Sequence, residues 1–153
     1  MNKIVEIINK KPVLFLILSL AYLFSVGFLK WAFTPPLAGL WFVVGGVVGI
    51  YFLDGADAFF HLSPSPFRSI VFAAAFVVVS LFVVTSSGSM LASGLVLSLY
   101  TTLILWQLGE WHVRGNLNEW YRMIAGPVPV GVQRWGVVLF VVILLMETYL
   151  FIR

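Results

Sequence analysis

Residues 37–61 read LAGLWFVVGGVVGIYFLDGADAFFH, an apolar run that ends in Asp54, Asp57 and His61. A helix needs about 20 consecutive apolar residues to cross the hydrocarbon core of a bilayer. The whole chain shares this character: 61% of its residues are hydrophobic, 10% are charged, and its mean hydropathy is +1.06. Too little polar surface remains to coat a water-soluble globule. The sequence therefore predicts an all-α fold, a polytopic transmembrane helical bundle.

Five stretches of the chain reach spanning length. Pro35-Pro36 separates the first two, because proline is not tolerated in a helix interior, and the polar residues 85–89 separate the third from the fourth. The expected spans are residues 13–33, 37–53, 67–84, 90–111 and 133–152. We expect residues 1–153 to form a single integral membrane domain. Within it, residues 1–12 form a basic interfacial segment and residues 112–132 a cytoplasmic loop.

The basic residues predict the orientation of the bundle. Five crossings place the N-terminal tail, the second loop and the fourth loop on one side. Seven of the nine basic residues fall on that side: Lys3, Lys10, Lys11, Arg68, Arg114, Arg122 and Arg134. Because Lys and Arg are enriched in cytoplasmic loops, the N-terminus is expected in the cytoplasm. The chain is thus predicted to be a multi-pass protein of the inner, cytoplasmic membrane of a bacterium.

The acids that follow the second span are the first candidates for chemistry. If the helix continues past Leu53, Asp54, Asp57 and His61 stand at positions i, i+3 and i+7 and share one face. Such a set would supply carboxylate and imidazole ligands for one divalent metal ion. The alternative interpretation is structural, because Asp54-Gly55 is also a turn signature that would end the helix.

A second polar cluster closes the fourth span. Glu110 and Arg114 are one helical turn apart, at a spacing that favours an ion pair. His112 points elsewhere if the helix continues. Together with Asp54 and Asp57, these residues are expected to line the cytoplasmic face, where Arg68, Arg114 and Arg122 could neutralise the acids.

Lys30 and Glu147 are charged residues inside predicted spans. Both lie toward the outer ends of their helices, at similar depth in the proposed topology. Unpaired charges in a bilayer are costly, so the sequence predicts an intramembrane ion pair that joins the first and fifth spans. Simple snorkelling of the long side chains to the interface is the alternative.

Small residues at i, i+4 spacing mark two of the spans. Gly45 and Gly49 lie on the second span, and Gly94 and Ser98 lie on the fourth. Small faces of this kind let helices approach closely in membranes. They predict tight helix packing and do not by themselves prove dimerisation.

The acidic end of the second span, the Ser-Gly turn and the helix beginning Gly94-Leu95-Val96-Leu97 resemble small bacterial polytopic membrane proteins, themselves similar to predicted membrane-bound metal-dependent hydrolases. The resemblance covers roughly residues 45–120. It implies an acidic pair and a histidine facing a His-x-x-x-Asp on a later helix. Asp54, Asp57 and His61 match the first part loosely, whereas Thr102 and Trp106 stand at the positions of the second. The resemblance therefore implies a decayed site more than a working hydrolase.

The preferred interpretation is a non-enzymatic structural or interaction subunit of a membrane. The alternatives are a metal-dependent membrane hydrolase, with Glu110 as general base, and a small ion or proton carrier. No cofactor is expected, and a divalent metal ion bound by Asp54, Asp57 and His61 is the alternative. The expected partners are the lipid bilayer and a second copy or another membrane protein. No basic run or phosphate loop indicates a nucleic acid, and the lack of cysteine excludes disulfides.

Overall fold

The computed structural model describes residues 13–32, 34, 36–61, 67–122, 124 and 126–153, and these residues form helices joined by short connections. The helices are α2 (Val13–Trp31), α3 (Ala38–Phe60), α4 (Ile70–Ser86), α5 (Met90–Arg114) and α6 (Val130–Ile152), with a 3₁₀ turn, η1 (Asn118–Tyr121), between the last two. The predicted all-α helical bundle is confirmed. The predicted basic interfacial segment at 1–12 lies outside the described residues.

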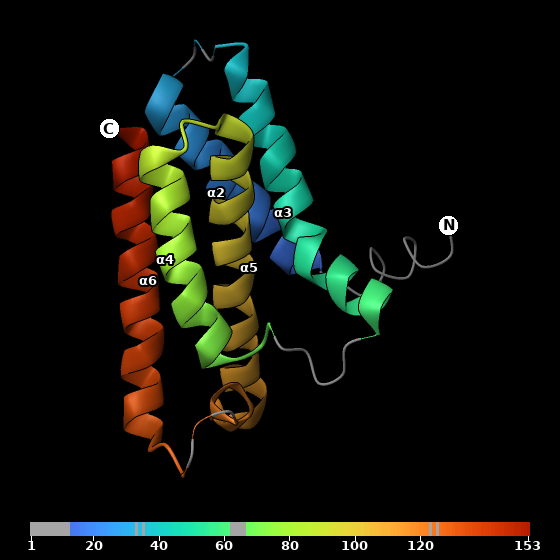
Figure 1. The fold of residues 1–153 in the computed structure, drawn as a ribbon, viewed down its shortest axis with the longest axis vertical. Coiled ribbons are helices and arrows are strands. Elements are labelled where there is room, and N and C mark those ends of the chain that lie inside the picture. Colours follow the sequence, from blue (N-terminus) through green and yellow to red (C-terminus); the bar gives the residue numbers. More distant parts are fainter. Residues whose placement is uncertain (1–12, 33, 35, 62–66, 123, 125) are drawn as a thin grey trace.

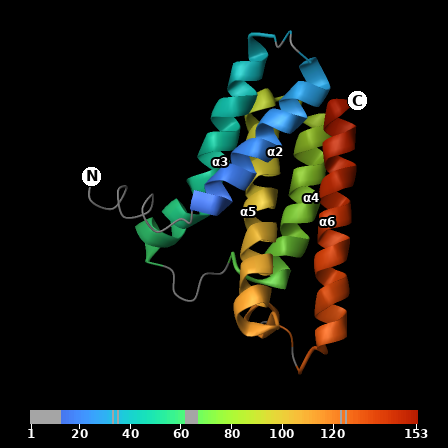
Figure 2. The ribbon, with the colours of Figure 1, turned by 180° about the vertical axis from the view of Figure 1, so that it is seen from behind.

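The helices run side by side and alternate in direction, so the C-terminus lies at the end opposite the start of α2 (Figures 1 and 2). One end of the bundle is formed by residues 67–70, 107–122 and 128–134, and we call it the charged end. The opposite end carries the α4–α5 turn and the C-terminus, and we call it the terminal end. Both views show the last turns of α3 leaning away from the lower part of α5.

Glycines bring α3 and α5 into backbone contact. A Cβ atom added at Gly45 would lie 2.0 Å from the carbonyl oxygen of Leu91. One added at Gly94 would lie 2.1 Å from the carbonyl oxygen of Phe42, and Gly49 is similarly enclosed. No side chain larger than hydrogen fits between backbones this close. The two predicted small-residue faces therefore pack against each other within one chain.

The bundle buries several polar side chains, while large apolar side chains lie on its outer surface. Large apolar side chains such as Phe24, Phe82 and Leu139 are more than 60% exposed. The buried polar side chains are Ser19, Ser69, Ser80, Ser93, Ser98, Thr101, Thr102, Gln107, Gln133, Glu147 and Thr148. In water this distribution would be unfavourable, whereas lipid accepts an apolar exterior.

Four of the helices, α2, α3, α5 and α6, are long and apolar enough to cross a membrane. The fifth, α4, is apolar but has 17 residues. At 1.5 Å per residue it measures about 25 Å, slightly less than the roughly 30 Å of a hydrocarbon core. By length and composition, the fold is that of a membrane protein.

The helix boundaries differ from the expected spans most clearly in α3. It was expected to end at Leu53 but continues to Phe60, so Asp54-Gly55 does not end it. His61 ends it instead, in a left-handed conformation with φ of 54°. Glycine inside a helix costs only about 1 kcal/mol relative to alanine, so the residues that follow Gly55 can continue the helix. The other helices differ from the expected spans by two or three residues at one or both ends.

Candidate functional site

The acids of α3 lie on its last turns, which lean away from the lower part of α5 (Figures 1 and 2). Asp54 and Asp57 are half-buried in the last turns of the helix, and His61 is exposed. Because His61 adopts a left-handed conformation, its side chain no longer continues the helical face that carries the two acids. Among the described residues, no group of three His, Asp or Glu side chains is placed to hold a metal ion. The three-ligand geometry expected of Asp54, Asp57 and His61 is therefore not formed in this structure.

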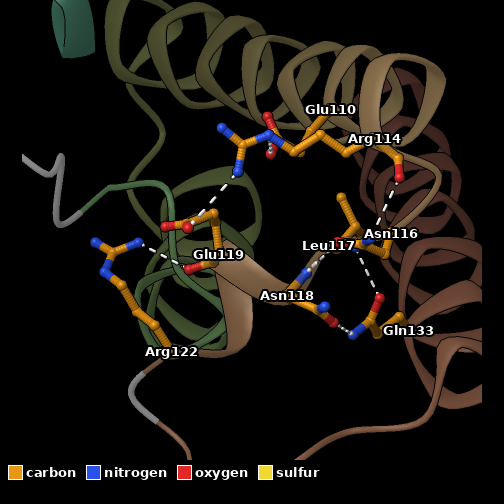
Figure 3. A network of polar contacts seen from close by, with 8 residues as sticks. All are labelled: Glu110, Arg114, Asn116, Leu117, Asn118, Glu119, Arg122 and Gln133. Carbon is orange, nitrogen blue, oxygen red and sulfur yellow. Dashed lines mark hydrogen bonds and ion pairs between the residues drawn. The ribbon is translucent and has the colours of Figure 1, made fainter.

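Figure 3 shows the charged pairs that the structure does form at the charged end. The Arg114 Nε lies 3.0 Å from Glu110 Oε1, which confirms the predicted pair on the last turn of α5. The same guanidinium lies 3.6 Å from Glu119 Oε1 on η1, a contact that the sequence did not predict. His112 is exposed on a different part of the helix, as expected of a continuous α5.

Hydrogen bonds of the Gln133 side chain link the α5–α6 connection to the first turn of α6. This side chain is fully buried. Its Oε1 accepts a hydrogen bond of 2.7 Å from the backbone N–H of Leu117, and its Nε2 donates to Asn118 Oδ1 at 2.8 Å and to the Val128 carbonyl at 3.2 Å (Figure 3). One amide thus bonds three groups, of which the Leu117 N–H would otherwise be buried without a partner. Sequence reasoning treated Gln133 only as the start of a span.

The α5–α6 connection also closes the end of the bundle with apolar side chains. Leu117, Trp120 and Tyr121 are buried there. Burial raises the pKa of the Tyr121 phenol above its ordinary value. Within the predicted loop, Asn118–Tyr121 forms a 3₁₀ turn, and the Asn118 side chain accepts a hydrogen bond from Gln133.

The arginines of the charged end bind backbone and aromatic groups. The Arg122 Nη1 donates to the carbonyl oxygens of Arg68 at 2.8 Å and of Glu119 at 2.9 Å. The Arg68 guanidinium lies 4.3 Å from the ring centroid of Trp106, a cation–π contact. These contacts tie the start of α4 to α5 and η1.

The predicted ion pair of Lys30 and Glu147 is wrong. The Lys30 Nζ donates to the carbonyl oxygen of Phe151 at 2.5 Å and lies 4.6 Å from the centroid of the Phe151 ring. Glu147 instead meets Ser80 of α4, whose Oγ lies 2.9 Å from Glu147 Oε1. The two charges have similar depth, but Glu147 faces the interior of the bundle while Lys30 reaches the next turn of α6.

Thr102 and Trp106 have structural contacts. The Thr102 hydroxyl donates to the Ser98 carbonyl of its own helix at 3.1 Å, and Trp106 is buried beneath Arg68. Neither residue faces a described group of metal-binding side chains.

The described charged end therefore combines an ordered connection with exposed charges. The side chains of Arg114 and Glu119 are 55% and 57% exposed, although both belong to the network of Figure 3. Such an arrangement can present a fixed pattern of charge to another molecule. Comparison of the chain with protein-family models, with curated proteins and with solved structures gives no match.

Proposed function

We propose that this chain is a multi-pass protein of the cytoplasmic membrane, with five crossings and its N-terminus in the cytoplasm. The apolar outer surfaces of the helices support lipid as the solvent. Lys and Arg gather at the charged end, whereas Lys30 and Arg153 belong to the other end. The positive-inside rule then assigns the charged end to the cytoplasm. The 17-residue helix α4 is within the range that a locally thinned bilayer accommodates.

This topology can be tested with single cysteines, because the chain has none of its own. Ser87→Cys places a thiol at the terminal end, and Ile124→Cys places one in the α5–α6 connection; both positions are exposed. We expect a membrane-impermeant maleimide to label intact cells through Ser87→Cys alone. Ile124→Cys should react only after permeabilisation. The reverse pattern would overturn the orientation, and labelling of both positions in intact cells would overturn the number of crossings.

Within the membrane, the protein acts as a non-enzymatic interaction subunit whose charged end contacts another protein. The observation that carries this proposal is the anchoring of the α5–α6 connection by Gln133. A surface that is already ordered loses little conformational entropy on binding, which favours its use as a docking site. The exposed Arg114 and Glu119 side chains supply charges of both signs, suited to a partner with complementary charges.

A photoreactive amino acid at position 119 tests this use of the charged end, with position 87 as the matched control at the terminal end. We expect a cross-linked protein of defined mass from position 119 and none from position 87. Mass spectrometry then distinguishes a second copy of this chain from another membrane protein. Adducts to lipid alone at both positions would contradict the proposal.

The hydrolase alternative receives less support from the geometry. Its proposed general base, Glu110, is engaged by Arg114 at 3.0 Å, and the described acids and histidines form no three-ligand group. Metal analysis of the purified protein separates the two functions. An interaction subunit should contain the same background metal in the wild type and in Asp57→Ala. A stoichiometric metal that Asp57→Ala loses would establish the hydrolase instead.

The carrier alternative is also less well supported. A relay that starts at Asp54 would need polar groups along the interior face of α3. The buried residues of that helix are Gly39, Phe42, Gly45, Gly46, Gly49, Ile50 and Leu53. This face offers no side chain that exchanges a proton or coordinates an ion.

A further inference from the structure

Glu147 is an acid in the interior of the bundle, apart from the charged end. Its side chain is fully buried, and it is the only fully buried acid among the described residues. Helices α2, α4 and α5 all pack against α6, which carries it. An ionisable side chain in such a place is expensive to keep and is a candidate for function.

The groups that face Glu147 from the neighbouring helices are neutral. From α4, the Ser80 Oγ lies 2.9 Å from Glu147 Oε1. From α5, Tyr100 is fully buried and stacks on Phe140 of α6 with ring centroids 4.3 Å apart, and its hydroxyl has no hydrogen-bond partner among the described residues. From α2, the Tyr22 hydroxyl forms a hydrogen bond with the hydroxyl of Thr148, the residue that follows Glu147. Within the part of the chain that the structure describes, Glu147 Oε2 also lacks a hydrogen-bond partner.

The positive charge that α2 contributes does not reach this carboxyl. The Lys30 ammonium donates to the Phe151 carbonyl, one turn farther along α6. An ionised Glu147 would therefore stand in the interior without a counter-charge among the described residues. Burial of an unpaired carboxylate is so unfavourable that such groups take up a proton instead.

The hydrogen bonds around Ser80 give an independent reason for a proton on Glu147. The Ser80 Oγ lies 3.0 Å from the Val77 carbonyl of its own helix and 2.9 Å from Glu147 Oε1. A hydroxyl has one hydrogen to donate. If Ser80 gives that hydrogen to Val77, as helical serines commonly do, its oxygen can meet Glu147 only as an acceptor. Oε1 must then carry the hydrogen that completes the contact.

Thr148, the next residue of α6, makes a similar contact with Tyr22, whose hydroxyl carries a hydrogen to donate. The Thr148 Oγ1 donates to the Leu144 carbonyl of its own helix at 2.8 Å. The Tyr22 hydroxyl, which also contacts Thr148 Oγ1, is therefore the donor in that pair. The contacts at Glu147 and Thr148 thus follow one pattern. In each, a helical hydroxyl, that of Ser80 or of Thr148, donates to a carbonyl of its own helix and accepts a hydrogen bond from another helix.

We propose that Glu147 is a proton-binding site inside the membrane. One proton binds the carboxylate at Oε1 and yields a neutral carboxyl, which donates to Ser80 while Ser80 donates to Val77. When the proton leaves, Ser80 must turn its hydrogen from Val77 to the carboxylate. A negative charge then lies between α4 and α6. Occupancy by the proton is thereby linked to the contact between these two helices.

Infrared spectroscopy of the full chain in phosphatidylcholine vesicles at neutral pH tests this site, with the four glutamates, Glu6, Glu110, Glu119 and Glu147, labelled with ¹³C at the carboxyl. We expect one isotope-shifted band of a protonated carboxyl. The band should disappear in Glu147→Gln and persist in Glu110→Gln, which removes a salt-bridged carboxylate. Four ionised glutamates in the wild type, or a band that survives Glu147→Gln, would overturn the proposal.

A second pair of variants keeps the test decisive if Glu147→Gln does not fold. Ser80→Ala removes the acceptor and should shift the protonated-carboxyl band to higher frequency. Ser98→Ala, which removes a buried hydroxyl with no hydrogen-bond partner among the residues described, should leave the band in place. An unchanged band in Ser80→Ala would show that Glu147 does not donate to Ser80 and would overturn the assignment.

Discussion

Along the α3–α5 interface, Gly45 and Gly94 bring two backbones into direct contact, whereas at the charged end Gln133 and Arg114 join separate segments through long polar side chains. The first contact is buried and steric, and it leaves no room for adjustment. The second is built from hydrogen bonds and ion pairs, several of which are open to solvent. Substitutions should therefore have very different effects in the two regions, since only the first lacks a means of relaxation.

The largest effect is expected where the backbones touch. Gly45→Leu would force a side chain into the carbonyl of Leu91, which a Cβ alone would approach to 2.0 Å. The helices would have to separate, at a cost of at least about 3 kcal/mol. Unfolding in mixed detergent micelles, followed by circular dichroism, measures this loss.

The matched control lies on the same helix. Gly55→Leu places the same side chain where nothing stands within 4 Å of the new Cβ. Because leucine is the better helix former, we expect the free energy of unfolding to stay the same or to rise by up to about 1 kcal/mol. Equal destabilisation by Gly45→Leu and Gly55→Leu would contradict a close backbone contact between α3 and α5 at Gly45.

An intermediate effect is expected at Gln133. Gln133→Leu keeps a side chain of similar size but removes its amide, which leaves the Leu117 N–H buried without its acceptor, at a cost of about 1–3 kcal/mol. The α5–α6 connection should become the first site of limited proteolysis. Gln107→Leu removes another buried amide, whose Nε2 has no partner in the described part of the chain, and should change stability far less. Similar proteolysis in both variants would show that Gln133 does not anchor the connection.

The smallest effect is expected for the solvent-exposed ion pair. Glu110→Gln removes one partner of Arg114, whose side chain is 55% exposed and keeps Glu119 at 3.6 Å. Pairs of this kind contribute about 0–0.5 kcal/mol and weaken further in salt. The free energy of unfolding at low and high ionic strength checks this. A loss as large as that of Gln133→Leu would place the ion pair among the main stabilising contacts of this end.

The local sequence was a poor guide to where α3 ends. Asp54-Gly55 has the residues of a turn, yet the helix runs through it to Phe60. A turn signature expresses a preference of about 1 kcal/mol, which the surrounding helix can override. The same difficulty applies to Trp120 and Tyr121. Both belong to the predicted cytoplasmic loop 112–132, but their side chains are buried in the structure.

The contacts of single polar residues were harder still to predict. Hydropathy predicts a similar depth for Lys30 and Glu147, but depth says nothing about rotation around a helix axis. Glu147 turns toward Ser80, and Lys30 reaches Phe151. By contrast, the Glu110–Arg114 pair was predictable because both residues lie on one helix at a fixed spacing.

The amino-acid sequence alone determined that the chain forms apolar helices of membrane-spanning length, where most of them begin and end, and which small residues allow close packing. These properties depend on local composition and on the helical period. Only the tertiary structure decided that the glycine faces pack against each other, that Gln133 anchors the α5–α6 connection, and that Glu147 lies buried against Ser80. Such pairings depend on how each helix is rotated and tilted against its neighbours, and that is set by the packing of the whole bundle.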